Sequence, residues 1–266
     1  MAVTIHPTAI VADNTAIGDG CAIGPFAIIE AGAVLGQNNE LGAGCHIYAT
    51  VTMGNGNRLR HGACLGGEPQ SLGYGSEPTR LQIGDDNWFG EYVTIHRGTA
   101  ASGKTVIGNR NYFMAYSHVG HDCRLGSQII VANSVNLAGH VQVMDRANLG
   151  GGAAIHQFAR VGELAMVGGL SRVSQDVLPF AVMARDNTLY GLNRVGIRRS
   201  DYPAAALPLL KAAYRRFCLD REPLDSFLLW LGRQEGNPLL ESWSRFFASG
   251  TERGYARAAR TPPVRE

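Results

Sequence analysis

A six-residue repeat runs through most of this chain and limits what it can fold into. Counting in sixes from Ile5 gives eleven consecutive apolar residues that end at Leu65, and counting from Ile107 gives a second unbroken series that ends at Val173. A period of six suits neither an amphipathic helix nor a β-hairpin. A short strand and a tight turn, repeated three times, instead form one 18-residue coil of a triangular prism. The repeat therefore predicts a mainly β protein built as a parallel β-helix.

Glycine supports this interpretation. The chain has 34 glycines in 266 residues, which is nearly twice the usual share of about 7%. Many of them directly follow the repeated apolar residue, as do Gly18, Gly24, Gly36, Gly42, Gly108, Gly120, Gly126 and Gly162. We expect the apolar residue to point into the prism and the glycine to supply the backbone freedom of the turn.

Two interruptions and a change of period define the organisation of the chain. The sixth positions lose their large apolar residues in 66–80 and 96–106, so we expect both segments to be loops that protrude from the prism. After Tyr202 the apolar spacing becomes helical, for example at Leu224, Phe227, Leu228 and Leu231. We therefore predict a β-helix of about ten coils over residues 1–190 and a C-terminal α-helical domain over 191–266.

The overall charge excludes several classes of protein. The chain has 24 Lys and Arg against 22 Asp and Glu, too balanced for a nucleic-acid binder or a polybasic membrane-surface protein. No signal peptide or apolar stretch of about 18 residues is present, so we expect a cytoplasmic protein without stable membrane insertion. The five cysteines lack the spacing of a disulfide framework or zinc knuckle. Residues 181–266 hold 14 basic and 9 acidic residues, which favours an acidic partner or an anionic ligand.

Four histidines point to a functional site. Residues 18 apart lie above one another in successive coils, about 4.8 Å apart. His121, His140 and His156 follow the stacked positions Val119, Leu137 and Ile155 by two, three and one residues, and His118 comes just before. A single histidine would be read as a surface turn residue. Four along one edge of the prism indicate a site.

Two chemistries could use this edge. Imidazoles can bind a metal ion, or they can act as general bases and hydrogen-bond donors. A metal needs three ligands at about 2 Å from one point, which the stacking distance disfavours unless a neighbouring subunit contributes. Asp122 lies next to His121 and would orient its ring, although it is equally compatible with a solvated turn residue. Gly139 offers an unobstructed N–H for an oxyanion, so acyl transfer fits better than metal binding.

A set of short motifs surrounds these residues: SEPTR at 76–80, VTIHRGT at 93–99, HVGHDCRLG at 118–126, LAGHV at 137–141, AIHQF at 154–158 and MVGG at 166–169. Together they resemble a known family, the acyl-[acyl-carrier-protein]–UDP-N-acetylglucosamine O-acyltransferases of lipid A biosynthesis. The resemblance implies a left-handed parallel β-helix and a homotrimer with active sites in clefts between subunits. It further implies transfer of a 3-hydroxyacyl chain from acyl carrier protein to the 3-hydroxyl of UDP-N-acetylglucosamine, the first step of lipid A biosynthesis, without a metal or another cofactor.

The resemblance also assigns roles to residues. His121 is similar to the general base that takes the proton of the sugar 3-hydroxyl, with Asp122 beside it and the Gly139 N–H as the oxyanion donor. The expected substrate-binding residues are His118, His140 and His156 lining the cleft, Gln157 at the nucleotide phosphates, Gly169 in the acyl groove, and Asn193, Arg198 and Arg199 in a nucleotide-binding stretch.

The chain departs from the family pattern at the first loop. The family sequence QDLKY is replaced here by QSLGY at 70–74, so Ser71 and Gly73 stand in place of an acidic sugar contact and a lysine. The segment between Asn187 and Gly191 is about two residues shorter than expected. These departures leave open N-acylation of a UDP-3-amino sugar or the use of another nucleotide sugar. Two rivals from other classes are a metal-dependent enzyme of the gamma carbonic anhydrase type and a non-catalytic scaffold.

Overall fold

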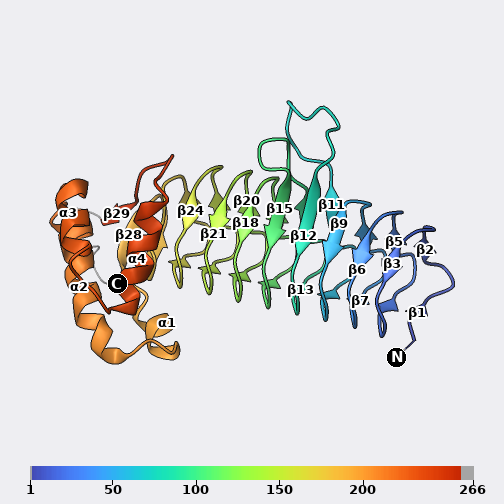
Figure 1. Ribbon diagram of the computed structural model, residues 1–266, viewed down its shortest axis with the longest axis horizontal. Helices are drawn as coiled ribbons and strands as arrows, with labels where there is room; N and C mark the ends of the chain where they lie inside the picture. Colours follow the sequence, from blue (N-terminus) through green and yellow to red (C-terminus); the bar gives the residue numbers. More distant parts are fainter. Residues whose placement is uncertain (1, 259–266) are drawn as a thin grey trace.

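Three long sheets form a triangular prism, which a bundle of helices closes at the C-terminal end (Figure 1). The structure is a computed structural model that describes residues 2–258. The chain visits sheets A, B and C in turn, so as far as β26 the strands that are neighbours in a sheet are three apart in the strand order. Nearly all of these pairs are parallel, as the repeat predicts for a β-helix.

Most strands are only two residues long. Sheet A contains β1 (Thr4–Ile5), β4 (Ala22–Ile23), β7 (Glu40–Leu41), β10 (Arg58–Leu59), β13 (Trp88–Phe89), β16 (Tyr112–Phe113), β19 (Ile130–Val131), β22 (Asn148–Leu149), β25 (Met166–Val167), β27 (Ala181–Ala184), β28 (Thr188–Leu192) and β29 (Arg257–Ala258). Sheet B contains β2 (Ile10–Val11), β5 (Ile28–Ile29), β8 (His46–Ile47), β11 (Cys64–Gly67), β14 (Thr94–His96), β17 (His118–Val119), β20 (Asn136–Leu137), β23 (Ala154–Ile155) and β26 (Arg172–Val173). Sheet C contains β3 (Ala16–Ile17), β6 (Val34–Leu35), β9 (Val51–Met53), β12 (Arg80–Ile83), β15 (Lys104–Ile107), β18 (Arg124–Leu125), β21 (Gln142–Val143) and β24 (Arg160–Val161).

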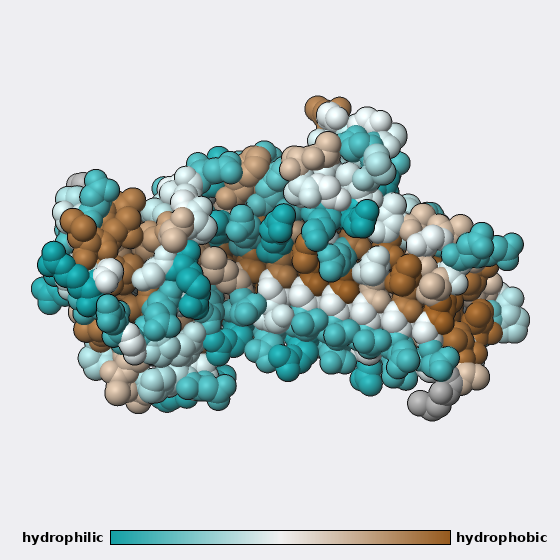
Figure 2. Space-filling view, in the orientation of Figure 1, coloured by the Kyte–Doolittle hydropathy of each residue, from teal (hydrophilic) through white to brown (hydrophobic). Residues whose placement is uncertain are grey.

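The repeated apolar residues fill the inside of the prism. In sheet B, Val119 pairs with Leu137 and Leu137 pairs with Ile155, and none of the three is more than 2% exposed. This register of 18 residues is the one that the repeat predicts. Outside the prism, hydrophilic side chains lie on both sides of an apolar stripe that follows its length (Figure 2).

The glycines after the apolar residues have a different role from the one expected. None of these glycines has a positive φ. A Cβ on Gly120 would lie only 2.8 Å from the nitrogen of Gly139 in the next coil, so glycine is needed for the close approach of stacked coils. The left-handed conformation falls two residues later, at positions such as Asp122 (φ 61°) and His140 (φ 62°). The prediction that these glycines supply turn freedom is therefore wrong.

Two loops protrude side by side from the corner between sheets B and C, near β11, β12 and β15 (Figure 1). Residues 68–79 connect β11 to β12, and residues 97–103 connect β14 to β15. Hydrogen bonds tie the two insertions together: the N–H of Arg97 donates to the carbonyl of Gly67 (3.0 Å), and the N–H of Ala100 donates to Oε1 of Glu77 (3.0 Å). We call these segments the first loop and the second loop.

The helices follow β28 and pack over the end of the prism. They are α1 (Arg194–Arg199), a 3₁₀ turn η1 (Ala204–Ala206), α2 (Leu207–Tyr214), a π-helical turn η2 (Arg215–Leu219), α3 (Leu224–Leu231) and α4 (Pro238–Ala248). The buried rings of Phe217, Phe227 and Trp243 form their core. The indole of Trp243 donates to the carbonyl of Pro179 (3.0 Å), which fastens α4 to the prism.

The helical region predicted over 191–266 extends past the described residues, because 259–266 lie outside them. Sheet A itself continues through β28 to Leu192, and β29 returns to its edge near the C-terminus. Among residues 2–258, no helix combines the length and apolarity that crossing a bilayer would need.

Candidate active site

The turns that join sheet B to sheet C bring the predicted histidines together. We call this corner of the prism the B–C edge, and it consists of residues 120–123, 138–141 and 156–159 in three successive coils. Neighbouring residues of each turn face opposite sides of the edge. His121, Gly139 and Gln157 line a groove on the sheet B side with His118 and Asn136, whereas Asp122, His140 and Phe158 line a second pocket on the sheet C side.

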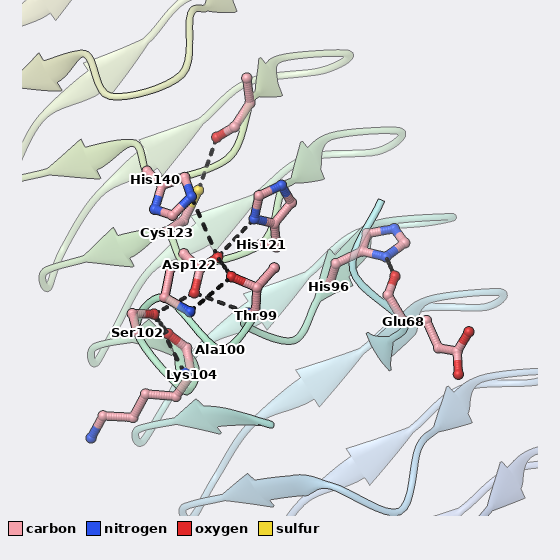
Figure 3. Close-up of polar contacts among 12 residues, drawn as sticks. Glu68, His96, Thr99, Ala100, Ser102, Lys104, His121, Asp122, Cys123 and His140 are labelled. Atoms are coloured by element: carbon pink, nitrogen blue, oxygen red, sulfur yellow. Dashed lines mark hydrogen bonds and ion pairs between the residues drawn. The ribbon is translucent and has the colours of Figure 1, made fainter. Parts of the chain in front are cut away.

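His121 and Asp122 form a hydrogen-bonded pair at the centre of the edge (Figure 3). The distance from Nδ1 of His121 to Oδ2 of Asp122 is 2.8 Å. A carboxylate only accepts hydrogen bonds, so the hydrogen of the neutral ring lies on Nδ1. Nε2 is then left with a free lone pair. This tautomer is the one that a general base requires.

The carboxylate of Asp122 is buried and held by the second loop. Oδ1 accepts from the N–H of Thr99 at 3.0 Å and from the hydroxyl of Ser102, and Oδ2 accepts from the hydroxyl of Thr99 at 2.8 Å. Its side chain has no exposed surface. Burial raises the pKa of Asp122, but the donors from Ser102, His121 and Thr99 outweigh it and hold the pKa below its usual value. Asp122 is therefore a carboxylate at neutral pH.

Gly139 lies directly against the ring of His121. A Cβ on Gly139 would be 2.6 Å from Cε1 and 2.7 Å from Nε2 of His121, so any side chain here would displace the imidazole. Within residues 2–258 the N–H of Gly139 makes no hydrogen bond. A free N–H beside the basic nitrogen can stabilise an oxyanion.

His118 and His96 form an uncharged neighbourhood on the sheet B side. Their ring centroids are 5.2 Å apart. Burial, and to a lesser degree His96, lower the pKa of His118 to about 4, and burial also lowers the pKa of His96. His118 Nδ1 lies 2.9 Å from the hydroxyl of Thr94. Next to His121 there is thus a neutral, fixed imidazole.

Comparison with known proteins places this chain in a family. An acyl-[acyl-carrier-protein]–UDP-N-acetylglucosamine O-acyltransferase of Alkalilimnicola ehrlichii is 45% identical over 258 residues, which cover 95% of this chain and 99% of the relative. The protein of the same name from Verminephrobacter eiseniae is 48% identical over 214 residues, covering 79% of this chain and 81% of the relative. The chain belongs to this O-acyltransferase family.

Solved structures and a family sequence model support the same family. The UDP-N-acetylglucosamine acyltransferase of Bacteroides fragilis matches with a TM-score of 0.91 at 34% identity, over 96% of this chain and 100% of the other. The Campylobacter jejuni acyltransferase gives 0.89 at 33% identity, over 96% and 100%. The model described as "Udp N-acetylglucosamine O-acyltransferase; Domain 2" matches residues 176–256. As in these structures, the β-helix is left-handed.

In this acyltransferase His140 and His156 lie apart from the sheet B groove. His140 stacks on Phe158 with ring centroids 4.5 Å apart, and its Nε2 lies 3.6 Å from Oδ2 of Asp122 on the side opposite His121 (Figure 3). The ring of His156 is exposed, with Nδ1 near the carbonyl of Gln157 (3.1 Å). All three histidines belong to the B–C edge as expected, but they point in different directions.

Among residues 2–258, the side chains of His121, Asp122 and His140 form the one group that could hold a metal ion. One ligand atom from each of His121, Asp122 and His140 can be chosen within 4.8 Å of the others. Both oxygens of Asp122 already accept hydrogen bonds from Thr99, Ser102 and His121. A cation would have to displace these donors, so the geometry suits proton transfer better than metal ligation.

The remaining predicted residues lie on other elements. The backbone of Ser71 bonds within the first loop, and its neighbour Gln70 lines the groove instead. Gly169 is exposed at the corner between sheets A and B. The side chain of Asn193 caps α1 by accepting from the N–H of Gly196 (2.9 Å), and α1 ends with the exposed Arg198 and Arg199. Within one chain these residues are not assembled around His121.

The structure also adds residues that the sequence alone did not indicate. Thr99 and Ser102 bind Asp122, and Gln70 and Asn136 line the groove. Thr99 lies in the VTIHRGT motif, but its distance of 23 residues from Asp122 matches no repeat. A loop inserted into the repeat has no periodicity from which its contacts could be predicted.

Proposed function

We propose that this acyltransferase moves a 3-hydroxyacyl chain from the thioester of acyl carrier protein to the 3-hydroxyl of UDP-N-acetylglucosamine. Two relatives named acyl-[acyl-carrier-protein]–UDP-N-acetylglucosamine O-acyltransferase, which match 80% and 95% of this chain, support the donor and the acceptor in this proposal. The observation that carries the proposal is the pair of His121 and Asp122 at 2.8 Å, in which His121 lines the same groove as Gly139 with its free N–H.

The reaction follows from these groups. Nε2 of His121 takes the proton of the acceptor hydroxyl while the oxygen attacks the thioester carbonyl. The N–H of Gly139 stabilises the oxyanion that forms, and Asp122 stabilises the imidazolium. When the intermediate collapses, the C–S bond breaks and His121 returns its proton to the departing thiolate. The products are the ester and the free thiol, and no cofactor takes part.

Recognition of the UDP-sugar is assigned to the residues around the groove. His118 and Gln157 lie in the groove next to His121. His140, His156 and Asn193 are proposed cleft contacts, and the guanidinium groups of Arg198 and Arg199 suit a diphosphate. Because Arg198, Arg199 and Gly169 lie on other elements of the same chain, we propose a homotrimer in which a second subunit completes each site.

The acyl carrier protein is proposed to dock on the helical region. The basic side chains of the helical region include Arg215, Arg216 and Arg221. Arg216 is bound to both oxygens of Glu222 at 2.7 and 2.8 Å and lies over the ring of Trp230. Arg215 and Arg221 are exposed, so they are the better candidates for an acidic partner. We further propose that the enzyme acts in the cytoplasm.

An acyl-transfer assay with the purified full-length protein tests the function. A 3-hydroxyacyl carrier protein and UDP-N-acetylglucosamine should yield the O-acyl product, and His121→Ala should lower the rate by roughly 10² to 10⁴-fold. His61→Ala is the matched control, because His61 is an exposed histidine packed edge-on against Tyr92 at a different corner. Absence of product from the native protein, or a His121→Ala rate like that of His61→Ala, would refute the proposal. Activity that a chelator abolishes and zinc restores would favour a metal-dependent enzyme.

A further inference from the structure

The second loop is an insertion that covers one acidic residue. Neighbouring coils are normally offset by 18 residues, but Ile95 of β14 pairs with Val119 of β17, 24 residues away. The segment that contains this insertion, residues 97–103, leaves the prism after His96 and returns at Lys104. It passes over the B–C edge, where Thr99 is 9% exposed.

The loop directs three hydrogen-bond donors at the carboxylate of Asp122. Thr99 contributes its N–H and its hydroxyl, at 3.0 and 2.8 Å, and Ser102 contributes its hydroxyl. The hydroxyl of Ser102 is also 2.9 Å from the carbonyl of Lys104, but its contact with Asp122 is the shorter one. With Nδ1 of His121 as the fourth donor, each oxygen of the carboxylate accepts two hydrogen bonds.

We propose that Thr99 and Ser102 are positioning residues, which keep Asp122 ionised and oriented so that His121 presents its basic nitrogen to the groove. The proposal rests on the proposed function and extends it. Each hydrogen bond stabilises the charged form of Asp122. A hydrogen-bonded carboxylate with one fixed orientation can receive Nδ1–H of His121 in one direction only. The loop thus acts on the reaction through Asp122 and does not touch the reacting atoms.

Other charged groups surround Asp122 without replacing these donors. His140 of the next coil approaches Oδ2 to 3.6 Å. Glu77 of the first loop binds the N–H of Ala100 and thereby holds the second loop in place. Arg124 and Arg160 of sheet C and Glu252 line the pocket on the far side, and Lys104 directs its Nζ to Gln82 (3.1 Å). Removing a hydroxyl from Thr99 or Ser102 therefore leaves the charges in place and changes the hydrogen bonds to Asp122.

The pH dependence of kcat/KM distinguishes positioning from a general structural role. Donors to the carboxylate oppose proton uptake by the coupled His121–Asp122 pair. Ser102→Ala and Thr99→Val should lower kcat/KM by about 10-fold at neutral pH. They should also shift the acidic limb of the pH profile of kcat/KM to higher pH, by about 0.5 to 1 unit. Ser102→Thr and Thr99→Ser keep a hydroxyl and should restore most of both properties. Ser127→Ala, which removes a hydroxyl from another corner of the prism, is the matched control.

A double-mutant cycle with Asp122→Asn gives a second test. If Ser102 acts through Asp122, then Ser102→Ala should have little further effect in the Asp122→Asn background, because residues that act as a unit are not additive. Independent losses that multiply would overturn the proposal. So would an unshifted acid limb, or equal damage from Ser102→Thr and Ser102→Ala in folded protein.

NMR of the histidine side chains tests the inference without an assay. Native protein should show His121 with its hydrogen on Nδ1, and Ser102→Ala should raise the proton affinity of this ring or populate the other tautomer. The signal of His121 is identified by its absence from the spectrum of the His121→Gln variant. If native protein lacks transferase activity but these shifts occur, the proposed function fails and the positioning role stands. If transfer is normal but the His121 signal is unchanged in Ser102→Ala, the positioning role is wrong.

Discussion

Nδ1 of His121 lies 2.8 Å from Oδ2 of Asp122, its immediate neighbour in the sequence. Adjacent residues in an extended strand point to opposite faces and could not form this contact. Asp122 adopts the left-handed conformation of the turn, with φ at 61°, which brings its carboxylate back towards the ring. The pair of His121 and Asp122 is therefore a product of the tight turn that the β-helix repeats at every coil.

Substitution of Gly139 should abolish transfer without unfolding the protein. In Gly139→Ala the new methyl group would lie 2.6 Å from the ring of His121, and a side chain moves more easily than the stacked backbone. We expect kcat to fall at least about 10²-fold, because small misplacements of a catalytic group cost that much, with the melting temperature nearly unchanged. The measurement is steady-state kinetics together with thermal unfolding.

Gly232→Ala is the control for this substitution. Gly232 ends α3 with a φ of −64°, and a methyl group there would make only ordinary contacts, the nearest at 3.4 Å. It should leave both activity and stability close to those of the native protein. A fully active Gly139→Ala enzyme would contradict the packing that we describe between Gly139 and His121.

The burial of His118 predicts a loss of stability in acid. The pKa of His118 is about 4 in the folded chain and near 6.5 in an unfolded one. Between these values the unfolded state binds more protons, so the free energy of unfolding falls as the pH drops from about 6.5 to 4. After allowance for partial exposure to solvent, we expect a contribution of about 1 to 2 kcal/mol. Urea unfolding at pH 7 and pH 4.5 would measure it.

His118→Asn provides the comparison, because asparagine does not titrate. The variant should lose less stability than the native protein over the same pH interval. Equal losses in the two proteins would mean that His118 does not carry this pH dependence. His6→Asn, at an exposed site near the N-terminus, should behave like the native protein.

Charge reversal in the helical region should affect the natural donor selectively. We expect the combined Arg215→Glu and Arg221→Glu variant to raise KM for acyl carrier protein substrates about 10-fold or more, because it replaces attraction by repulsion at an acidic partner. A short acyl-thioester analogue should be used as before. Arg58→Glu is the control, because Arg58 lies in β10, which several strands of sheet A separate from β28 and the helices that follow it. Equal effects on both donors would exclude docking at these arginines.

The first loop should set the affinity for the acceptor. Ser71 is a weaker hydrogen-bond acceptor for a sugar hydroxyl than a carboxylate, a difference of about 1 to 2 kcal/mol or 5 to 30-fold in affinity. The Ser71→Asp and Gly73→Lys double variant should therefore lower KM for UDP-N-acetylglucosamine, which acceptor titrations at saturating donor would measure. An unchanged KM would mean that the difference in this loop is neutral, and a native preference for a UDP-3-amino sugar would reassign the acceptor.

The sequence by itself determined the prism and the location of the site. A six-residue apolar period can be buried in only one register, so it stacks Val119, Leu137 and Ile155 and brings His121, His140 and Gln157 to one corner. The helical spacing after Tyr202 likewise places Phe227 and Leu231 inside a helical core. Burial of apolar side chains fixes both features, and their periods are visible in the sequence.

Only the tertiary structure decided what each residue at that corner does. The left-handed turn positions send Asp122 and His140 to one side of the edge and leave His121 with Gly139 on the other. The contacts of Thr99 and Ser102 with Asp122 depend on the path of an inserted loop, and Gly120 is needed for coil stacking and not for its conformation. Backbone dihedral angles at a turn and the course of an aperiodic loop are set by packing between segments distant in sequence, and that packing exists only in the folded chain.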